Sequence, residues 1–178
     1  MPILYIFAGL PGTGKSTLAR RLAADRGSVY LRIDTVEQTL RDAGLPLRGP
    51  EGYVIAYAVA VDNLGLGRDV VADSVNPLAI TRNAWRDVAE RCNSGFVEIE
   101  VICSDAAEHR SRVEARSSDI PHLRLPTWSD VARREYDPWD RPHIVIDTSG
   151  QSVSQSLAAL QRSLSPDNPE SYTGETTA

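Results

Sequence analysis

The stretch that decides the fold reads Ile3-Leu4-Tyr5-Ile6-Phe7-Ala8-Gly9-Leu10-Pro11-Gly12-Thr13-Gly14-Lys15-Ser16-Thr17. Its first part, residues 3–7, is an unbroken apolar run, as in strands that are buried on both faces. The run leads into the pattern Gly9-x-x-x-x-Gly14-Lys15-Ser16, and residues 16–26 then repeat apolar side chains at helical spacing. A strand, a glycine-rich loop and a helix in this order predict a phosphate-binding P-loop.

The residue types in this loop match what a bound polyphosphate needs. The glycines can adopt backbone angles that a Cβ atom would forbid, so successive N–H groups can surround a phosphate. Lys15 is expected to reach the β and γ phosphates of a nucleotide, and the Ser16 hydroxyl is expected to bind Mg²⁺. The predicted nucleotide-binding residues are Gly9, Pro11, Gly12, Thr13, Gly14, Lys15, Ser16 and Thr17.

Lys15 carries the most specific signal in the loop. It is the only lysine among the 19 basic residues of the chain. A compact ammonium group at this position, in a chain that uses arginine everywhere else, indicates a site that needs a point charge and not a planar fork. The alternative is a glycine-rich turn that binds nothing, and the strand and helix that flank the loop argue against it.

Composition and charge narrow the class of protein. The chain has 178 residues, of which 42% are apolar and 24% charged, and this fits one globular domain. No apolar run approaches the ~20 residues of a membrane span, and the N-terminus lacks a basic leader, so we expect a cytoplasmic protein. The net charge of −5 argues mildly against a long nucleic acid as ligand. Cys92 and Cys103 fit no metal or redox spacing and are expected to be reduced thiols.

Strand and helix patterns alternate along the rest of the chain. Strands are expected at 3–7, 29–33, 69–73, 96–102 and 143–147, with helical patterns between them. This alternation predicts an α/β fold in which helices cover both faces of a parallel sheet. We expect a single domain over residues 1–164, with an acceptor-side insertion at about 41–67, a lid at about 110–141 and a disordered tail at 165–178.

Carboxylates stand at the expected ends of three strands, where parallel sheets bind their ligands. Asp34 is expected to face the γ phosphate and to accept a proton from an attacking hydroxyl; the alternative is a cap on a helix that begins at Thr35. Asp73 is expected to hold the water shell of Mg²⁺ or to orient the substrate, and its alternative is a turn residue. Asp147 is expected to be a turn or cap residue outside the catalytic set.

Arg112 and Arg116 lie four positions apart in a charged helix that is expected at 105–116. Guanidinium groups above the nucleotide would stabilise charge on the phosphoryl group during transfer, so both are candidate catalytic residues. The alternative is a solvated helix face on which they pair with Glu108 and Glu114. Arg110 points elsewhere on this helix and is expected at the surface.

Further residues are candidates for contacting a substrate. Tyr53 and Tyr57 stand at helical spacing in the insertion, and the alternative for such aromatic pairs is core packing. Asn76, in the loop after the third strand, is grouped with Asp73 as a substrate-binding candidate. The three histidines share no metal-like spacing, so we expect no metal besides Mg²⁺.

Together these motifs resemble the small P-loop kinases related to polynucleotide kinase, zeta toxins and chloramphenicol phosphotransferase, which are AAA-type ATP-binding, kinase-like proteins. The resemblance covers about residues 3 to 150. It rests on the stretches Gly9-Leu10-Pro11-Gly12-Thr13-Gly14-Lys15-Ser16-Thr17, Leu31-Arg32-Ile33-Asp34, Val70-Val71-Ala72-Asp73-Ser74-Val75-Asn76, Arg112-Val113-Glu114-Ala115-Arg116, Tyr136-Asp137-Pro138-Trp139 and Ile144-Val145-Ile146-Asp147-Thr148.

The resemblance implies a nucleoside-monophosphate-kinase-like sheet in the strand order 2-3-1-4-5. It also implies that Asp34 is the general base, that an arginine lid surrounds Arg112 and Arg116, and that ATP donates its phosphoryl group directly to a hydroxyl. It leaves the acceptor open, because members of this group phosphorylate nucleic-acid ends, sugars, sugar nucleotides and antibiotics.

We therefore expect an ATP- and Mg²⁺-dependent phosphotransferase that acts on a hydroxyl of a small molecule such as an antibiotic, a nucleoside or a sugar. The acidic net charge favours a small acceptor. The preference for arginine over lysine suggests a GC-rich genome, in which enzymes of antibiotic resistance are common. Two alternatives remain, namely a polynucleotide 5′-hydroxyl kinase and a nucleotide-dependent switch or binding protein without an acceptor.

Overall fold

The computed structural model describes residues 1–165, so the tail expected at 165–178 lies outside the described residues except for Ser165. The strands are β1 (Ile3–Ala8), β2 (Val29–Arg32), β3 (Val70–Asp73), β4 (Gly95–Ile102) and β5 (Ile144–Asp147). The helices are α1 (Lys15–Arg26), α2 (Ile33–Asp42), α3 (Glu51–Gly65), α4 (Ala79–Arg91), α5 (Ala106–Glu114), α6 (Trp128–Ala132) and α7 (Val153–Ser163).

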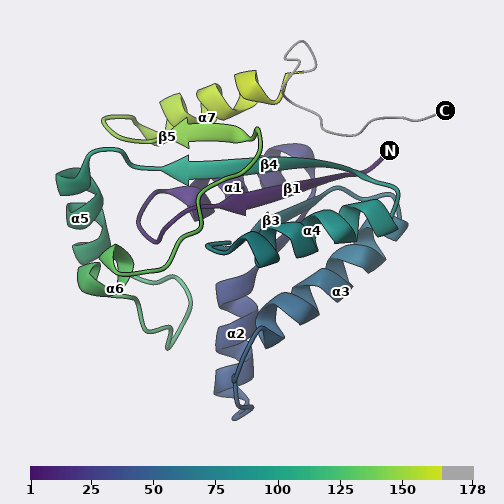
Figure 1. The fold of residues 1–178 in the computed structure, drawn as a ribbon, viewed down its shortest axis with the longest axis horizontal. Coiled ribbons are helices and arrows are strands. Elements are labelled where there is room, and N and C mark those ends of the chain that lie inside the picture. Colours follow the sequence, from purple (N-terminus) through teal and green to yellow (C-terminus); the bar gives the residue numbers. More distant parts are fainter. Residues whose placement is uncertain (166–178) are drawn as a thin grey trace.

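The strands form one parallel sheet in the order β2-β3-β1-β4-β5, so the expected strand order is confirmed (Figure 1). β1 lies at the centre, with Phe7 opposite Asp73 of β3 and Ala8 opposite Glu100 of β4. Because all strands run in one direction, their carboxyl ends share one edge of the sheet. The P-loop and the start of α2 lie at that edge, where ligands of open parallel sheets bind.

β1 is apolar throughout because helices cover both faces of the sheet. Leu4 and Ile6 belong to a core cluster with residues of α3 and α4, whereas Tyr5 and Phe7 belong to a cluster with residues of α1 and α7. This is the alternation of side chains that a strand imposes, and all four side chains are fully buried. The loops at the carboxyl edge therefore start from a tightly packed frame.

Two differences between the expected and observed helix bounds affect the site. α2 begins at Ile33, directly after β2, so Asp34 lies in a helix and not at the end of a strand. α5 ends at Glu114, so the expected helix at 105–116 is too long. Beyond it, the Ser118 hydroxyl accepts from the Ile120 N–H at 3.0 Å and donates to the Ile120 carbonyl at 2.9 Å. Such local bonding of serine competes with helical hydrogen bonds.

Residues 115–127 connect α5 to α6 without a helix or strand, and we call them the lid loop. In Figure 1 they lie beside α6, at the edge of the sheet toward which the strand arrows point. Within residues 1–165, no helix has both the length and the apolar character needed to cross a membrane. Cys92 and Cys103 are both free thiols, as expected.

Candidate active site

The P-loop, residues 9–17, is shaped by glycines with left-handed backbone angles. The φ angle is +139° at Gly9, +88° at Gly12 and +91° at Gly14. A Cβ atom at Gly9 would lie 2.2 Å from the carbonyl oxygen of Val101, and one at Gly12 would lie 2.5 Å from Cγ2 of Val113. Only glycine therefore fits where the loop meets β4 and α5. Gly14 is the N-cap of α1, so the first N–H groups of this helix face the loop, as anion binding at a helix N-terminus requires.

Lys15 and Asp73 form a buried ion pair behind this loop. Lys15 Nζ lies 2.8 Å from Asp73 Oδ1, and the two side chains are 8% and 1% exposed. Burial alone would raise the pKa of Asp73, but the Lys15 ammonium and the hydrogen bonds from Lys15 and Tyr30 hold this pKa below its usual value. Asp73 is therefore ionised, and its charge fixes the position of Lys15 before any nucleotide binds.

Ser16 and Asp73 supply oxygen atoms of the kind that Mg²⁺ prefers. The Ser16 hydroxyl accepts from Lys15 Nζ at 3.4 Å, and its proximity helps to lower the pKa of the Asp73 carboxyl group. A hydroxyl and a carboxylate fit Mg²⁺, which keeps several water molecules in nucleotide sites and takes further ligands from the phosphates. The described part of the chain has no cluster of three or more His, Cys, Asp or Glu side chains that could hold a metal. The donor set thus suits a metal ion that arrives with a nucleotide.

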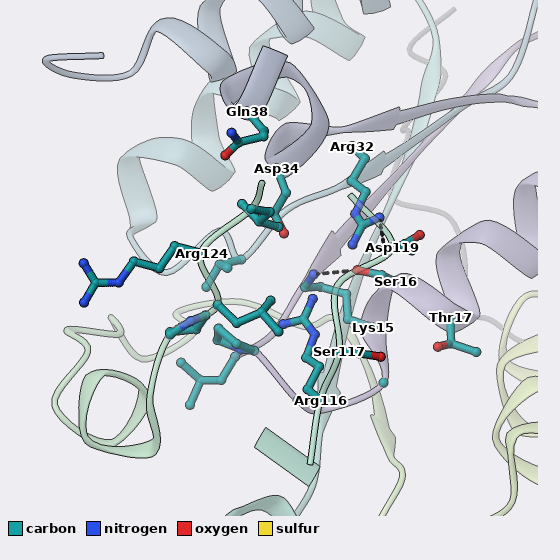
Figure 2. Close-up of a pocket in the computed structure, with 18 of the residues that line it drawn as sticks. Lys15, Ser16, Thr17, Arg32, Asp34, Gln38, Arg116, Ser117, Asp119 and Arg124 are labelled. Atoms are coloured by element: carbon teal, nitrogen blue, oxygen red, sulfur yellow. Dashed lines mark hydrogen bonds and ion pairs between the residues drawn. The ribbon is translucent and has the colours of Figure 1, made fainter. Parts of the chain in front are cut away.

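A cavity of about 1230 Å³ opens beside the P-loop (Figure 2). The P-loop and the start of α1 form one wall, and α2 and the lid loop form the other. Figure 2 shows Asp34 and Arg116 pointing into the same space as Lys15, although the three residues come from separate segments. The volume exceeds the roughly 300–1,000 Å³ of a typical small-molecule site, so two ligands can lie side by side.

Asp34 lies in the first turn of α2, where it is partly buried and lines the cavity. The N-cap of this helix is Arg32 and no side chain caps it, so the alternative of Asp34 as a cap is wrong. Asp34 accepts no hydrogen bond from any side chain or N–H group in residues 1–165, and its oxygen atoms face the cavity. Asp147, in contrast, accepts from the N–H groups of Ser104 and Ser149, which confirms its expected turn role.

Arg112 and Arg116 both line the cavity, but they are held differently. Arg112 donates to the hydroxyl and the carbonyl of Thr148 at 2.8 and 2.9 Å, and it pairs with Glu108 at 2.6 Å. Arg116 lies beyond the end of α5, in the lid loop, and has no ion-pair partner among the described residues. The two arginines therefore do not share a helix face, and Arg116 is the one with an unengaged guanidinium group. Arg110 is exposed, as expected.

Tyr53, Tyr57 and Asn76 lie beside or within the core. Both tyrosines pack against the cluster under α3 and α4, and the ring of Tyr57 meets that of Trp85 edge-on with centroids 4.6 Å apart. Asn76 is fully buried, and its Nδ2 donates to the Phe7 carbonyl at 2.9 Å, which ties the loop after β3 to the end of β1. The geometry gives these residues structural roles, and their contact with a substrate stays a prediction.

The sequence interpretation missed an ion-pair cluster that we call the Asp119 clamp, made of Asp119, Arg20 and Arg32. Asp119 Oδ1 accepts from Arg32 Nη1 at 2.9 Å, and Oδ2 accepts from Arg20. These bonds, first from Arg32 and then from Arg20, lower the pKa of Asp119 to about 2. The partners lie 87 and 99 positions apart, so no local pattern connects them. The available signal was an arginine at the end of an otherwise apolar strand.

His109 of α5 joins the helix to the P-loop. Its Nε2 lies 2.8 Å from the Pro11 carbonyl, which can only accept, so Nε2 carries the proton. Trp128 of α6 packs edge-on against the imidazole ring, with centroids 5.2 Å apart. The P-loop, α5 and α6 are thereby linked through one side chain.

Comparison with known proteins agrees with this architecture. A family model described as an AAA domain matches residues 4–134. An uncharacterised protein of Mycobacterium tuberculosis is 33% identical over 172 residues, which covers 86% of this chain and 34% of that protein. The chain thus spans about a third of the length of this relative. A protein of Aeropyrum pernix assigned as a probable adenylyl-sulfate kinase is 24% identical over 165 residues, covering 89% of this chain and 90% of that protein.

The fold also has a match among solved structures. The crystal structure of a proposed kinase from Chloroflexus aurantiacus superposes with a TM-score of 0.70, at 20% identity, over 90% of this chain and 97% of that chain. At this identity the match speaks for the fold alone, and that fold is the α/β fold of P-loop NTPases. With the family match and the P-loop geometry, it follows that the chain belongs to the AAA domain family, a group of AAA-type, kinase-like P-loop proteins.

Proposed function

We propose that this chain transfers the γ-phosphate of ATP to a hydroxyl group of a small molecule. The observation that carries the proposal is that one cavity joins the P-loop lysine, the carboxylate of Asp34 and the unengaged arginine of the lid loop. Phosphoryl transfer to an alcohol needs these three groups, because it requires a phosphate binder, a base within reach of the hydroxyl and a positive charge near the transferred group.

Each residue then has a defined role. Lys15 and the P-loop N–H groups hold the β and γ phosphates, and Asp34 accepts the proton of the acceptor hydroxyl. Arg116 stabilises charge on the transferred group, with Arg112 beside it. Ser16 and, through water, Asp73 would hold Mg²⁺, which supplies counter-charge to the phosphates when it is bound.

Two further observations support a small acceptor. The cavity is large enough for a nucleotide and a second small ligand, and it is closed on one side by the lid loop. The relative from Aeropyrum pernix is named as a kinase of adenylyl sulfate, which is a small molecule. The candidate acceptors are nucleosides, sugars and antibiotics, the last as substrates of a resistance-type phosphotransferase.

The test is an acceptor screen with labelled ATP over nucleosides, sugars, hydroxy acids and antibiotics, with a 5′-hydroxyl oligonucleotide as a further arm. We expect one class of small molecule to gain a single phosphate, detected by mass, and Asp34→Asn to abolish this product. Transfer to the oligonucleotide alone would make the chain a polynucleotide kinase. ATP hydrolysis that no acceptor changes, with a partner protein bound in one nucleotide state only, would make it a switch.

A further inference from the structure

Arg32 is a buried arginine whose Nε donor has no hydrogen-bond partner among the described residues. Its side chain is 7% exposed and lines the cavity. Nη1 donates to Asp119, whereas Nε is buried, has no hydrogen-bond partner among the described residues and lies 3.9 Å from Asp73 Oδ2. An unpaired buried donor costs free energy, and the nearby Asp73 carboxylate offsets part of this cost, so the guanidinium group has room for a further partner.

Asp119, which accepts a hydrogen bond from Arg32, belongs to the lid loop, which has no helix or strand. The side chain of Asp119 is 51% exposed, and that of Arg20 is 54% exposed. Its two carboxylate oxygens each accept from a different guanidinium group. A carboxylate placed between two arginines makes the contacts that an oxyanion of a ligand would make, because arginine binds carboxylate, sulfate and phosphate with the same fork of donors.

The charge of the cavity points to the same kind of ligand. Eight arginines and Lys15 line the cavity, against four carboxylates, although the whole chain carries a net charge of −5. Arg116, Arg124 and Arg134 have no ion-pair partner within residues 1–165. The cavity thus carries more positive charges than Lys15 and Arg116, which are assigned to the nucleotide. The additional charges suit a second anionic group.

We propose that Arg32 and Arg20 form a subsite for an oxyanion of the acceptor (a carboxylate, sulfate or phosphate group) and that Asp119 occupies this subsite in the ligand-free protein. The proposal rests on the proposed function and narrows its substrate class to alcohols that carry a negative charge. Arg32 precedes Asp34 by two positions at the junction of β2 and α2, and both face the cavity (Figure 2). An acceptor anchored on Arg32 therefore presents a hydroxyl a few bonds away from its oxyanion to Asp34.

Displacement of Asp119 would also connect acceptor binding to the lid loop. When a ligand oxyanion replaces the carboxylate, the lid loop loses its hydrogen bonds to α1 and to the end of β2. The loop still carries Arg116, which then can adjust toward the nucleotide. The subsite thus makes the position of the lid loop depend on whether the acceptor is present.

The experiment uses the full chain saturated with Mg²⁺ and a non-hydrolysable ATP analogue, so that the P-loop cannot bind the probe. Sulfate and, separately, acetate are titrated by calorimetry in every variant, and the Arg32 Nε–H resonance is followed by ¹⁵N NMR in the proteins that keep Arg32. We expect Asp119→Asn to bind sulfate at least about tenfold more tightly than the wild type, which corresponds to about 1.4 kcal/mol. We expect Arg32→Gln to lose this binding while it keeps its affinity for the nucleotide analogue.

Glu37→Gln is the matched control, because it removes one negative charge from the same cavity and leaves the Asp119 clamp intact. Circular dichroism and melting curves identify any variant that does not fold. Equal sulfate affinity in the wild type and Asp119→Asn would overturn the proposal. The proposal would also be overturned if sulfate bound to the complex with ADP but not to the complex with the ATP analogue. Arg32 and Arg20 would then bind the γ-phosphate of the nucleotide and not the acceptor. Failure to bind the analogue at all would contradict the proposed function itself.

Discussion

The two walls of the cavity are built in different ways. The P-loop wall consists of backbone held by glycines with left-handed angles, and its charges, Lys15 and Asp73, are buried. The lid wall consists of side chains of α2 and of the lid loop, and the lid loop is held by the half-exposed pair of Asp119 and Arg20 and by the pair of Asp119 with the buried Arg32. Exposed ion pairs contribute about 0–1 kcal/mol and are screened by salt, whereas loss of one partner of a buried pair costs about 3–5 kcal/mol.

This contrast suggests that the two walls bind different ligands. A wall of fixed backbone suits a phosphate chain that is the same in every turnover. A loop held at the half-exposed Asp119 can be rearranged by a ligand at less cost than a fixed backbone, and it therefore suits the substrate that must enter and leave. The following variants test the contrast, beginning with Asp34 of α2.

Asp34→Asn should have the largest effect, because it removes the base and leaves both walls in place. We expect transfer to fall by about 10²–10⁴-fold, the usual contribution of a general base, with unchanged affinity for ATP. Single-turnover rates and calorimetric binding measure the two quantities. Asp62→Asn, an exposed residue of α3, is the matched control. Full transfer by Asp34→Asn would remove this residue from the mechanism.

Lys15→Arg tests whether the P-loop wall needs a lysine at this position or only a positive charge. Arginine keeps the charge, but its planar group is larger and cannot occupy the buried position 2.8 Å from Asp73 in the same way. We expect the transfer rate to fall by about 100-fold, comparable to loss of one transition-state donor. Arg68→Lys, at an exposed position after α3, should leave the rate unchanged. A near-normal rate for Lys15→Arg would mean that this wall needs only a positive charge, and the contrast with the lid wall would weaken.

Gly12→Ala tests the backbone of the same wall. The added Cβ atom would lie 2.5 Å from Val113, so α5 or the loop must shift and affinity for ATP should drop by about tenfold or more. Gly27→Ala is the matched control, because Gly27 also has a left-handed angle but has no atom within 4 Å of the added carbon. We expect that control to lose about 1–2 kcal/mol of stability, the cost of a left-handed backbone angle for a residue with a Cβ atom, and no ATP affinity. Equal ATP affinity in both variants would show that the contact with α5 is not needed.

The same contrast explains how much of the molecule the sequence could predict. The strand 3–7, the glycines and Lys15 form one continuous pattern with local causes, so the P-loop and the parallel sheet were predicted correctly from the residues themselves. The strand order was also correct, but it came from the family resemblance and not from any local pattern. Asp34 was identified as a cavity residue because strand ends converge in parallel sheets, although the structure places it in the first turn of α2. Local periodicity and turn chemistry fix these features before any tertiary contact forms.

The lid wall was predicted less well for a physical reason. The Asp119 clamp joins residues 87 and 99 positions apart, and nothing near Asp119 distinguishes it from the other carboxylates of that polar segment. The helix at 105–116 was extended too far because the arginines continue the charged pattern, while α5 ends at Glu114, ahead of the turn in which Ser118 bonds to Ile120. The conformation of the lid loop depends on side-chain partners that are far away in the sequence, and a single sequence does not show which residues pair.

The smallest effect is expected at the Asp119 clamp itself. Because Arg32 and Arg20 lower the pKa of Asp119 from 3.8 to about 2, the stabilisation by the clamp is fully present above about pH 4 and is lost as the pH falls toward 2. Arg32→Gln should return this pKa toward 3.8, and Arg20→Gln should raise it less, since Arg32 makes the larger contribution. Carboxyl NMR titration measures both shifts, while the unfolding free energy of Arg20→Gln, which removes an exposed pair, should change by no more than about 1 kcal/mol.

Salt provides the control for this last prediction. Raising ionic strength from about 0.1 M to about 1 M shortens the screening length from about 10 Å to about 3 Å, so hydrogen exchange should quicken in the lid loop and stay constant in the P-loop. If the pKa of Asp119 stays near 2 in Arg32→Gln, or if both walls respond equally to salt, the lid wall is held by packing and not by exposed charge. It would then be as fixed as the P-loop wall, and an acceptor would have to fit it without rearranging it.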